Sequence, residues 1–428
     1  MTGSLPQLRP EVESLPRYVP GAATPSVSAA DAIATAPPTG ESPVVPEAAA
    51  AAQTGFLYVD NQRSITDRPD LHTVKLSSNE NPYLPLPAVI EAIHQASWAI
   101  NRYPDLQATA LVSALAAKAG VREDQIALGN GSVALLEHAL AAVLSHGDEV
   151  IYAWRSFEAY PICVAVAGGE SVRVPNTIDG RHDLTTMAKA VTDKTKVVII
   201  CSPNNPTGPA VGKVEFEKFM SELPSHILVI LDEAYVEYVR DPNAVNGKDY
   251  LQLYPNLISL RTLSKAYGLA GLRVGYALGN EQLISGIKAT ATPFGVNHLA
   301  QVAGVASLQP NAERVLSARI ATIVAERTRV RTALTRQGWN VPEAQGNFIW
   351  LPLGAQAKVF ADAAEKAGLL VRPFVDPESD ANSGVRVTVA DGDANNQFLR
   401  FAASWAIAHG LAPKDIDRVG GQSRSAQH

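Results

Sequence analysis

The stretch Arg261-Thr-Leu-Ser-Lys-Ala-Tyr-Gly-Leu-Ala-Gly-Leu-Arg-Val-Gly-Tyr276 follows a short, mostly apolar run at 257–260. The run is typical of a buried strand, so Ser264 and Lys265 are expected on the loop that leaves that strand. Loss of water at such a place lowers the pKa of a lysine and makes it a candidate imine-forming nucleophile. Arg273, eight residues further on, supplies a fixed cation of the kind that binds phosphate. A glycine-rich surface turn with ordinary solvated side chains is the alternative interpretation.

Two upstream stretches also carry polar residues where an apolar run ends: Val197-Val-Ile-Ile-Cys-Ser-Pro-Asn-Asn-Pro-Thr-Gly208 and Leu228-Val-Ile-Leu-Asp-Glu-Ala-Tyr235. Near-continuous apolar strands are typical of parallel sheets that are buried on both faces. Asp232 lies 27 residues after Asn205 and 33 residues before Lys265, so we expect successive strand ends around one crevice. A carboxylate there is costly unless it is paired. A proline-braced turn without a ligand is the alternative for the first stretch.

The segment Gly129-Asn-Gly-Ser-Val133 precedes a helical pattern. Exposed amides at a helix N-terminus form an anion site when glycines allow close approach. Alone, this signal is weak, because a turn with a serine cap has the same composition. Together with Ser264 and Arg273 it predicts a phosphate-binding cup to which Gly131 and Ser132 contribute.

Strand and helix patterns alternate between these motifs, which predicts an α/β fold with a large, mostly parallel sheet. Residues 312–337 form a long, charged, periodic helix suited to bridging two domains. The strands expected at 345–351, 369–374 and 384–389 would belong to a smaller α+β domain.

The chain has 428 residues, of which 46% are hydrophobic and 18% charged, with a net charge of −6. This balance argues against binding to nucleic acid, and no apolar run is long enough for a transmembrane helix. The first residues lack the features of a secretory signal, so we expect a cytoplasmic protein. Cys163 and Cys201 lie in apolar runs, which favours buried free thiols over a disulfide or a metal site.

The segment 261–276 resembles the lysine motif of fold-type-I aminotransferases that use pyridoxal phosphate. The similarity points to the branch of histidinol-phosphate aminotransferases and actinobacterial aromatic amino acid aminotransferases, and it covers most of residues 72–409. It implies a type I PLP-dependent transferase fold in which Lys265 carries the cofactor as a Schiff base. Ser264 and Arg273 would bind the cofactor phosphate.

The same resemblance implies roles for five further residues around the cofactor. Asn205 and Tyr235 would donate hydrogen bonds to its phenolic O3′, and Asp232 would pair with its ring nitrogen. Phe157 would stack on the ring, although an aromatic residue in the helix–sheet core is the alternative. Tyr103, within Asn101-Arg-Tyr-Pro-Asp105, would bind the phosphate in the neighbouring subunit of a homodimer, unless it is a packed loop aromatic.

Three residues are implied on the substrate side. Arg386 would bind the α-carboxylate through both nitrogens of its planar fork, with assistance from Asn347; an exposed arginine on an edge strand is the alternative. Arg372 could meet a substrate phosphate. Glu233, beside Asp232, is interpreted as a helix-start or surface polar group without a catalytic role.

The expected organisation combines pattern and resemblance. It comprises an N-terminal arm with a disordered Ala/Pro-rich insert (1–70), the N-terminal part of the small domain with a dimer arm (71–105), a large PLP-binding domain (106–300), a C-terminal small domain (301–410) and a loose tail (411–428).

The expected activity is ping-pong transfer of an amino group between an aromatic amino acid and 2-oxoglutarate. The string Trp154-Arg-Ser-Phe-Glu-Ala-Tyr-Pro161 favours this choice, since it resembles the actinobacterial aromatic subgroup. Histidinol phosphate is the alternative substrate. A PLP decarboxylase and a non-catalytic PLP-binding regulator are more remote alternatives.

Overall fold

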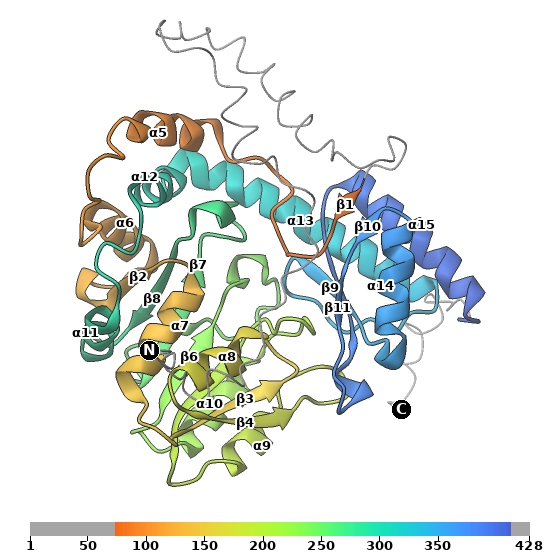
Figure 1. Cartoon of the computed structure of the whole chain (residues 1–428), viewed down its shortest axis with the longest axis horizontal. Helices are drawn as coiled ribbons and strands as arrows, with labels where there is room; N and C mark the ends of the chain where they lie inside the picture. Colours follow the sequence, from red (N-terminus) through yellow and green to blue (C-terminus); the bar gives the residue numbers. More distant parts are fainter. Residues whose placement is uncertain (1–72, 412–428) are drawn as a thin grey trace, which may run out of the picture.

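The computed structural model describes residues 73–411. The expected N-terminal arm (1–70) and the tail beyond residue 411 lie outside these described residues. The central element is a seven-stranded sheet with the order β2-β8-β7-β6-β5-β3-β4 (Figure 1). Its strands are β2 (Ile126–Gly129), β3 (Glu149–Trp154), β4 (Glu170–Pro175), β5 (Thr195–Cys201), β6 (Leu228–Asp232), β7 (Leu257–Thr262) and β8 (Gly275–Gly279).

Strand directions confirm the expected α/β class. Neighbouring strands from β4 through β3, β5 and β6 to β7 are parallel. Strand β8 runs antiparallel to both β7 and β2. Strands β5, β6 and β7 are adjacent, so their carboxyl ends meet at one edge of the sheet.

Helices cover both faces of this sheet. Successive strand residues point to opposite faces, and so Val197 and Ile199 of β5 belong to one hydrophobic cluster while Val198 and Ile200 belong to the other. The first cluster includes residues of α7 (Ser132–Val143), α8 (Ala159–Val166) and α11 (Glu281–Thr290). The second includes residues of α6 (Thr109–Ala119), α9 (Leu184–Lys189), α10 (Lys213–Glu222) and α12 (His298–Ser307). Burial on both faces explains why the central strands are mostly apolar.

A long helix connects this region to a second sheet. Helix α13 (Pro310–Arg336) begins with proline, whose fixed φ suits the first helical position. It runs from the side of α5 (Pro87–Ser97) and α12 toward the smaller sheet (Figure 1). That sheet is antiparallel with the order β11-β12-β9, and a separate parallel pair, β1-β10, lies beside it. The bounds are β1 (Val74–Lys75), β9 (Phe348–Leu351), β10 (Leu369–Leu370), β11 (Arg372–Phe374), β12 (Gly384–Thr388), α14 (Ala357–Lys366) and α15 (Gly392–Ala408).

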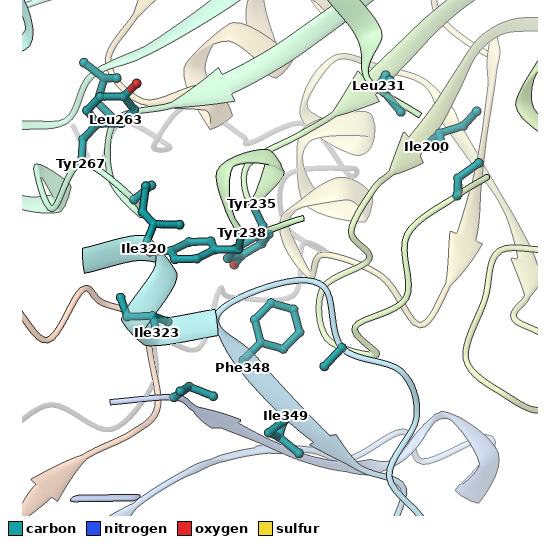
Figure 2. Packing of buried hydrophobic residues seen from close by; sticks show 14 of the residues in the cluster. Ile200, Leu231, Tyr235, Tyr238, Leu263, Tyr267, Ile320, Ile323, Phe348 and Ile349 are labelled. Carbon is teal, nitrogen blue, oxygen red and sulfur yellow. The ribbon is translucent and has the colours of Figure 1, made fainter. Parts of the chain in front are cut away.

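Buried side chains join the two sheets near the ends of the central strands. Tyr235 and Tyr238, which follow β6, pack close to Ile320 and Ile323 of α13 and to Phe348 of β9 (Figure 2). The rings of Tyr235 and Phe348 contact each other edge to face, with centroids 5.0 Å apart. Tyr235 is therefore held at the junction of the two sheets.

Two further findings concern sequence-based expectations. Cys163 and Cys201 are free thiols and both are buried, as expected. None of the helices within residues 73–411 is long and apolar enough to cross a membrane.

Candidate functional site

A cavity of about 180 Å³ lies at the carboxyl ends of β5, β6 and β7, between the two sheets. It brings together most of the site residues that the sequence predicted. Those that line it are Ser132, Phe157, Asn205, Asp232, Tyr235, Ser264, Lys265, Arg273, Arg372 and Arg386.

Lys265 lies on the loop after β7 and is only partly exposed. Its Nζ donates a 3.0 Å hydrogen bond to the carbonyl oxygen of Ser78. Burial lowers the pKa of Lys265 to about 7, and the positive charges of Arg386 and Arg273 act in the same direction. A large fraction of this amine is therefore unprotonated near neutral pH, as a nucleophile requires.

The expected phosphate cup is built from two segments. Ser132 is the first residue of α7, and Gly131 precedes it with a φ of +86°. A Cβ at Gly131 would collide with the guanidinium of Arg273, and one at Gly275 would lie 2.6 Å from the backbone nitrogen of Ser132. Arg273 Nη1 also lies 3.4 Å from the hydroxyl oxygen of Ser264. The helix N-terminus and the guanidinium therefore face one small space that suits a phosphate.

Asp232, at the end of β6, is almost fully buried. Its Oδ2 accepts a 2.7 Å hydrogen bond from the hydroxyl of Tyr160, and its Oδ1 lies 3.3 Å from the backbone nitrogen of Ala234. Burial raises the pKa of this carboxyl group. No lysine or arginine within residues 73–411 forms an ion pair with it, so the site suits a ligand that brings its own cationic N–H.

Tyr235 is supported by a residue that the sequence analysis did not single out. Asn79 Nδ2 donates a 3.0 Å hydrogen bond to the Tyr235 hydroxyl, and Asn347 Nδ2 donates a 3.1 Å bond to the carbonyl oxygen of Asn79. Burial raises the pKa of Tyr235 to about 12, so the phenol keeps its proton. Asn347 thus lies behind Asn79 and does not line the cavity itself.

Arg386 reaches the cavity from the small sheet. It lies on β12, the central strand of three, and is buried, so the edge-strand alternative is wrong. Its Nη1 donates a 2.6 Å hydrogen bond to Oδ1 of Asn205, and its Nη2 donates a 2.6 Å bond to the carbonyl oxygen of Ser77. Arg386 and Asn205 therefore meet across the space between the two sheets.

Tyr103, like Gly131 and Asn347, does not line this cavity. Its side chain is 82% exposed and packs on Phe294, with ring centroids 4.7 Å apart. The contact with Phe294 is compatible with the alternative of a packed loop aromatic, so the role of Tyr103 toward a neighbouring subunit stays a prediction. Trp98, Ile100 and Leu106 are also exposed nearby in the sequence.

Glu233 also differs from its interpretation as a surface or helix-start group. It is buried, and its Oε2 lies 2.9 Å from Nη2 of Arg261 and accepts a hydrogen bond from Ser259. Glu233 and Arg261 are neighbours because β6 and β7 pair, and a buried carboxylate needs such a partner.

Asn79 and Tyr160 are site residues that sequence reasoning missed. Tyr160 could have been suspected, since it belongs to the same string, Trp154–Pro161, as Phe157. The two rings pack edge to face with centroids 5.6 Å apart. For Asn79 the signal was only a polar residue in a dense turn; its positive φ of 53° is visible only in the structure.

Residues 72–397 match the family model described as aminotransferase class I and II. The aromatic amino acid aminotransferase of Streptomyces coelicolor is 44% identical over 400 residues, which cover 94% of this chain and 98% of that protein. The aromatic amino acid aminotransferase of Streptomyces avermitilis is 51% identical over 326 residues, covering 76% of this chain and 89% of that protein.

A solved structure has a similar fold along nearly the whole chain. It is the histidinol-phosphate aminotransferase of Sinorhizobium meliloti in complex with pyridoxal-5′-phosphate, with a TM-score of 0.75 and 25% sequence identity. The similarity covers 96% of this chain and 100% of that chain.

Proposed function

This chain belongs to the class I and II aminotransferases, and on that premise we propose that it transfers an amino group between an aromatic amino acid and 2-oxoglutarate. It is a pyridoxal-phosphate-dependent transaminase with the type I fold. The observation that carries the proposal is the cavity in which Lys265, Asp232 and Arg386 converge beside an anion cup. The names of the relatives at 44% and 51% identity support the aromatic substrate.

Pyridoxal phosphate fits the chemistry of the residues at this site. The cup formed by Gly131, Ser132, Ser264 and Arg273 suits its phosphate. Its protonated ring nitrogen is a fitting partner for the buried carboxylate of Asp232.

The remaining contacts proposed for the cofactor come from three side chains. Asn205 and Tyr235 would donate to its phenolic oxygen, and the Tyr235 phenol keeps the proton that this role requires. Phe157 lines the same cavity and supplies an apolar face for the ring.

When bound, the cofactor supplies an electron sink for the charge that develops on the α-carbon of the substrate. Arg386 would hold the α-carboxylate, and Asn347 would act indirectly by orienting Asn79. Lys265 would act as the base that carries the proton between the α-carbon of the substrate and the cofactor, which its low pKa permits. Asp232 would keep the proton on the ring nitrogen.

Histidinol phosphate is a second candidate substrate. Arg372 lines the cavity and offers a cation to a substrate phosphate. The structural likeness to a histidinol-phosphate aminotransferase is in keeping with this option.

Assembly as a homodimer with shared sites is also proposed. The exposed Tyr103 and the exposed apolar side chains Trp98, Ile100 and Leu106 support it, since a monomer would leave this group in water. Location in the cytoplasm stays a prediction from the sequence.

Two measurements test the proposal. Borohydride reduction of the holoenzyme should attach the cofactor to Lys265, and Lys265→Ala should lose the visible absorption of the bound cofactor, whereas Lys118→Ala should keep it. Label on another lysine would contradict the assignment.

Steady-state rates should be higher with phenylalanine and 2-oxoglutarate than with histidinol phosphate. Turnover of histidinol phosphate alone would overturn the choice of an aromatic substrate.

A further inference from the structure

The end of the cavity beside Phe374 carries an ion pair that the cofactor does not need. Nη2 of Arg372 lies 2.6 Å from Oε2 of Glu158, and both residues line the cavity. The Arg372 side chain is 8% exposed and that of Glu158 is 28% exposed. Arg372 comes from β11, whereas Glu158 immediately precedes α8, so the pair joins the two sides of the cavity.

Arg372 is the neighbour of the arginine proposed to hold the α-carboxylate. Arg372 and Arg386 are directly opposite each other in the antiparallel pairing of β11 and β12. Opposite residues of such a pair project from the same face of the sheet. Both guanidiniums lie 5.4 Å from the ring centroid of Phe374. A substrate with two carboxylates can therefore place one near each arginine.

The two substrates of the proposed reaction have opposite requirements at Arg372. An aromatic substrate brings a neutral side chain, and an arginine without a counter-ion beside it would be costly to bury. The 2-oxoglutarate that follows brings a second carboxylate and needs a cation. Glu158 allows the neutral aromatic side chain to bind, because it neutralises Arg372 while no external anion is bound.

Glu158 also has a second partner that would remain after it leaves Arg372. Its Oε1 lies 3.4 Å from Nη1 of Arg155, which is itself buried. Arg155 is held in place by hydrogen bonds to the carbonyl oxygens of Asn382 and Val375. Displacement of Glu158 from Arg372 would therefore not leave its carboxylate without a cation.

We propose that Glu158 is an exchangeable counter-ion of Arg372 that lets one cavity accept both neutral aromatic and anionic side chains. With an aromatic substrate the Glu158–Arg372 pair stays closed. With 2-oxoglutarate or another substrate that has a distal anion, that anion replaces Glu158 on Arg372 and Glu158 pairs with Arg155. The inference rests on the proposed function, because it explains how the two substrates of that reaction share a site.

The test uses Glu158→Gln in the holoenzyme and two unreactive ligands, glutarate and 3-phenylpropionate, measured by titration calorimetry. Glutarate should bind about tenfold more tightly, since it no longer competes with a carboxylate in a partly exposed ion pair. The affinity for 3-phenylpropionate should not rise. Adding Arg372→Gln to the same chain should abolish the gain in affinity for glutarate.

Glu326→Gln is a matched control, because Glu326 forms a 2.7 Å pair with Arg329 on α13, away from the cavity. This variant should leave the ratio of the two affinities unchanged.

Equal changes for both ligands, or no change for either, would show that the pair only supports the fold and would overturn the inference. If Glu158→Gln loses bound cofactor or thermal stability, Glu158→Asp is measured in its place. Its affinity for glutarate should also rise, by a smaller factor. Wild-type protein that fails to turn over phenylalanine would contradict the proposed function alone, because the binding of glutarate would still decide the role of Glu158.

Discussion

The hydroxyl of Tyr160, on helix α8, donates a 2.7 Å hydrogen bond to Oδ2 of Asp232 at the end of β6. Both residues are buried, and the pKa of Tyr160 lies well above its usual value because burial and the nearby Asp232 disfavour the phenolate. The tyrosine therefore acts as a permanent donor that orients the carboxylate toward the cavity.

Replacing Tyr160 by phenylalanine should lower kcat about five- to tenfold, because one hydrogen bond to a charged group is lost while the ring still packs. Tyr152→Phe is a matched control, since Tyr152 is a buried neighbour whose ring centroid lies 5.8 Å away and whose hydroxyl faces Arg173. Steady-state rates and the pH titration of the bound cofactor's absorption would be measured. Equal losses in the two variants would contradict a role through Asp232.

The low pKa of Lys265 predicts a pH-dependent cost to the cofactor-free fold. The unfolded chain protonates this lysine below its ordinary pKa of 10.5, but the folded chain does so only below about 7. Between these values the unfolded state binds more protons than the folded state. The loss in the free energy of unfolding that Lys265 causes therefore grows as the pH falls toward 7, and it is constant below pH 7. Cofactor-free Lys265→Met should thus be more stable than wild type at pH 7, and the difference should shrink toward pH 10.

Urea unfolding at several pH values would measure this difference. Lys358→Met is the control, because Lys358 is exposed and paired with Asp362 on α14; its difference from wild type should not shrink in the same way. A stability difference for Lys265→Met that widens as the pH rises would contradict the proposed desolvation of the amine.

Arg386→Lys should lower kcat/KM much more for substrates that have an α-carboxylate than for substrates that lack one. Lysine keeps the charge but loses the bidentate fork, and the loss of about 2 to 3 kcal/mol corresponds to about 30- to 150-fold in kcat/KM for phenylalanine. Histidinol phosphate has no carboxylate and should lose much less. Arg329→Lys, at an exposed fork-like pair with Glu326, is the control. Equal losses for both substrates would mean that Arg386 acts through the fold.

Mixed dimers test the proposed role of Tyr103. If Tyr103 serves the partner subunit, a dimer of one Tyr103→Phe chain and one Lys265→Ala chain keeps one intact site. Its rate should approach half that of wild type, above the average of the two parent homodimers. A fully active monomer in sedimentation experiments would refute the shared site, as would mixed dimers no more active than that average.

Much of the architecture could be predicted from the sequence, because it depends on local patterns. The apolar runs that end at Asp232 and before Lys265 specify buried strands, and glycines near Gly131 permit a tight anion loop. The short spacings between these motifs already implied parallel strands whose ends share an edge. The α/β fold and its mostly parallel sheet followed from such patterns and were confirmed.

What only the tertiary structure decided is which side chains meet across the two sheets. Arg386 and Asn205 are 181 residues apart, Arg372 and Glu158 are 214 apart, and Asn79 and Tyr235 are 156 apart. Local periodicity states which face of an element is apolar, but it carries no information on how two separate sheets dock. The error over Glu233 has the same origin: its partner Arg261 lies on the next strand, and the strand pairing, not the local sequence, gives the buried carboxylate its cation.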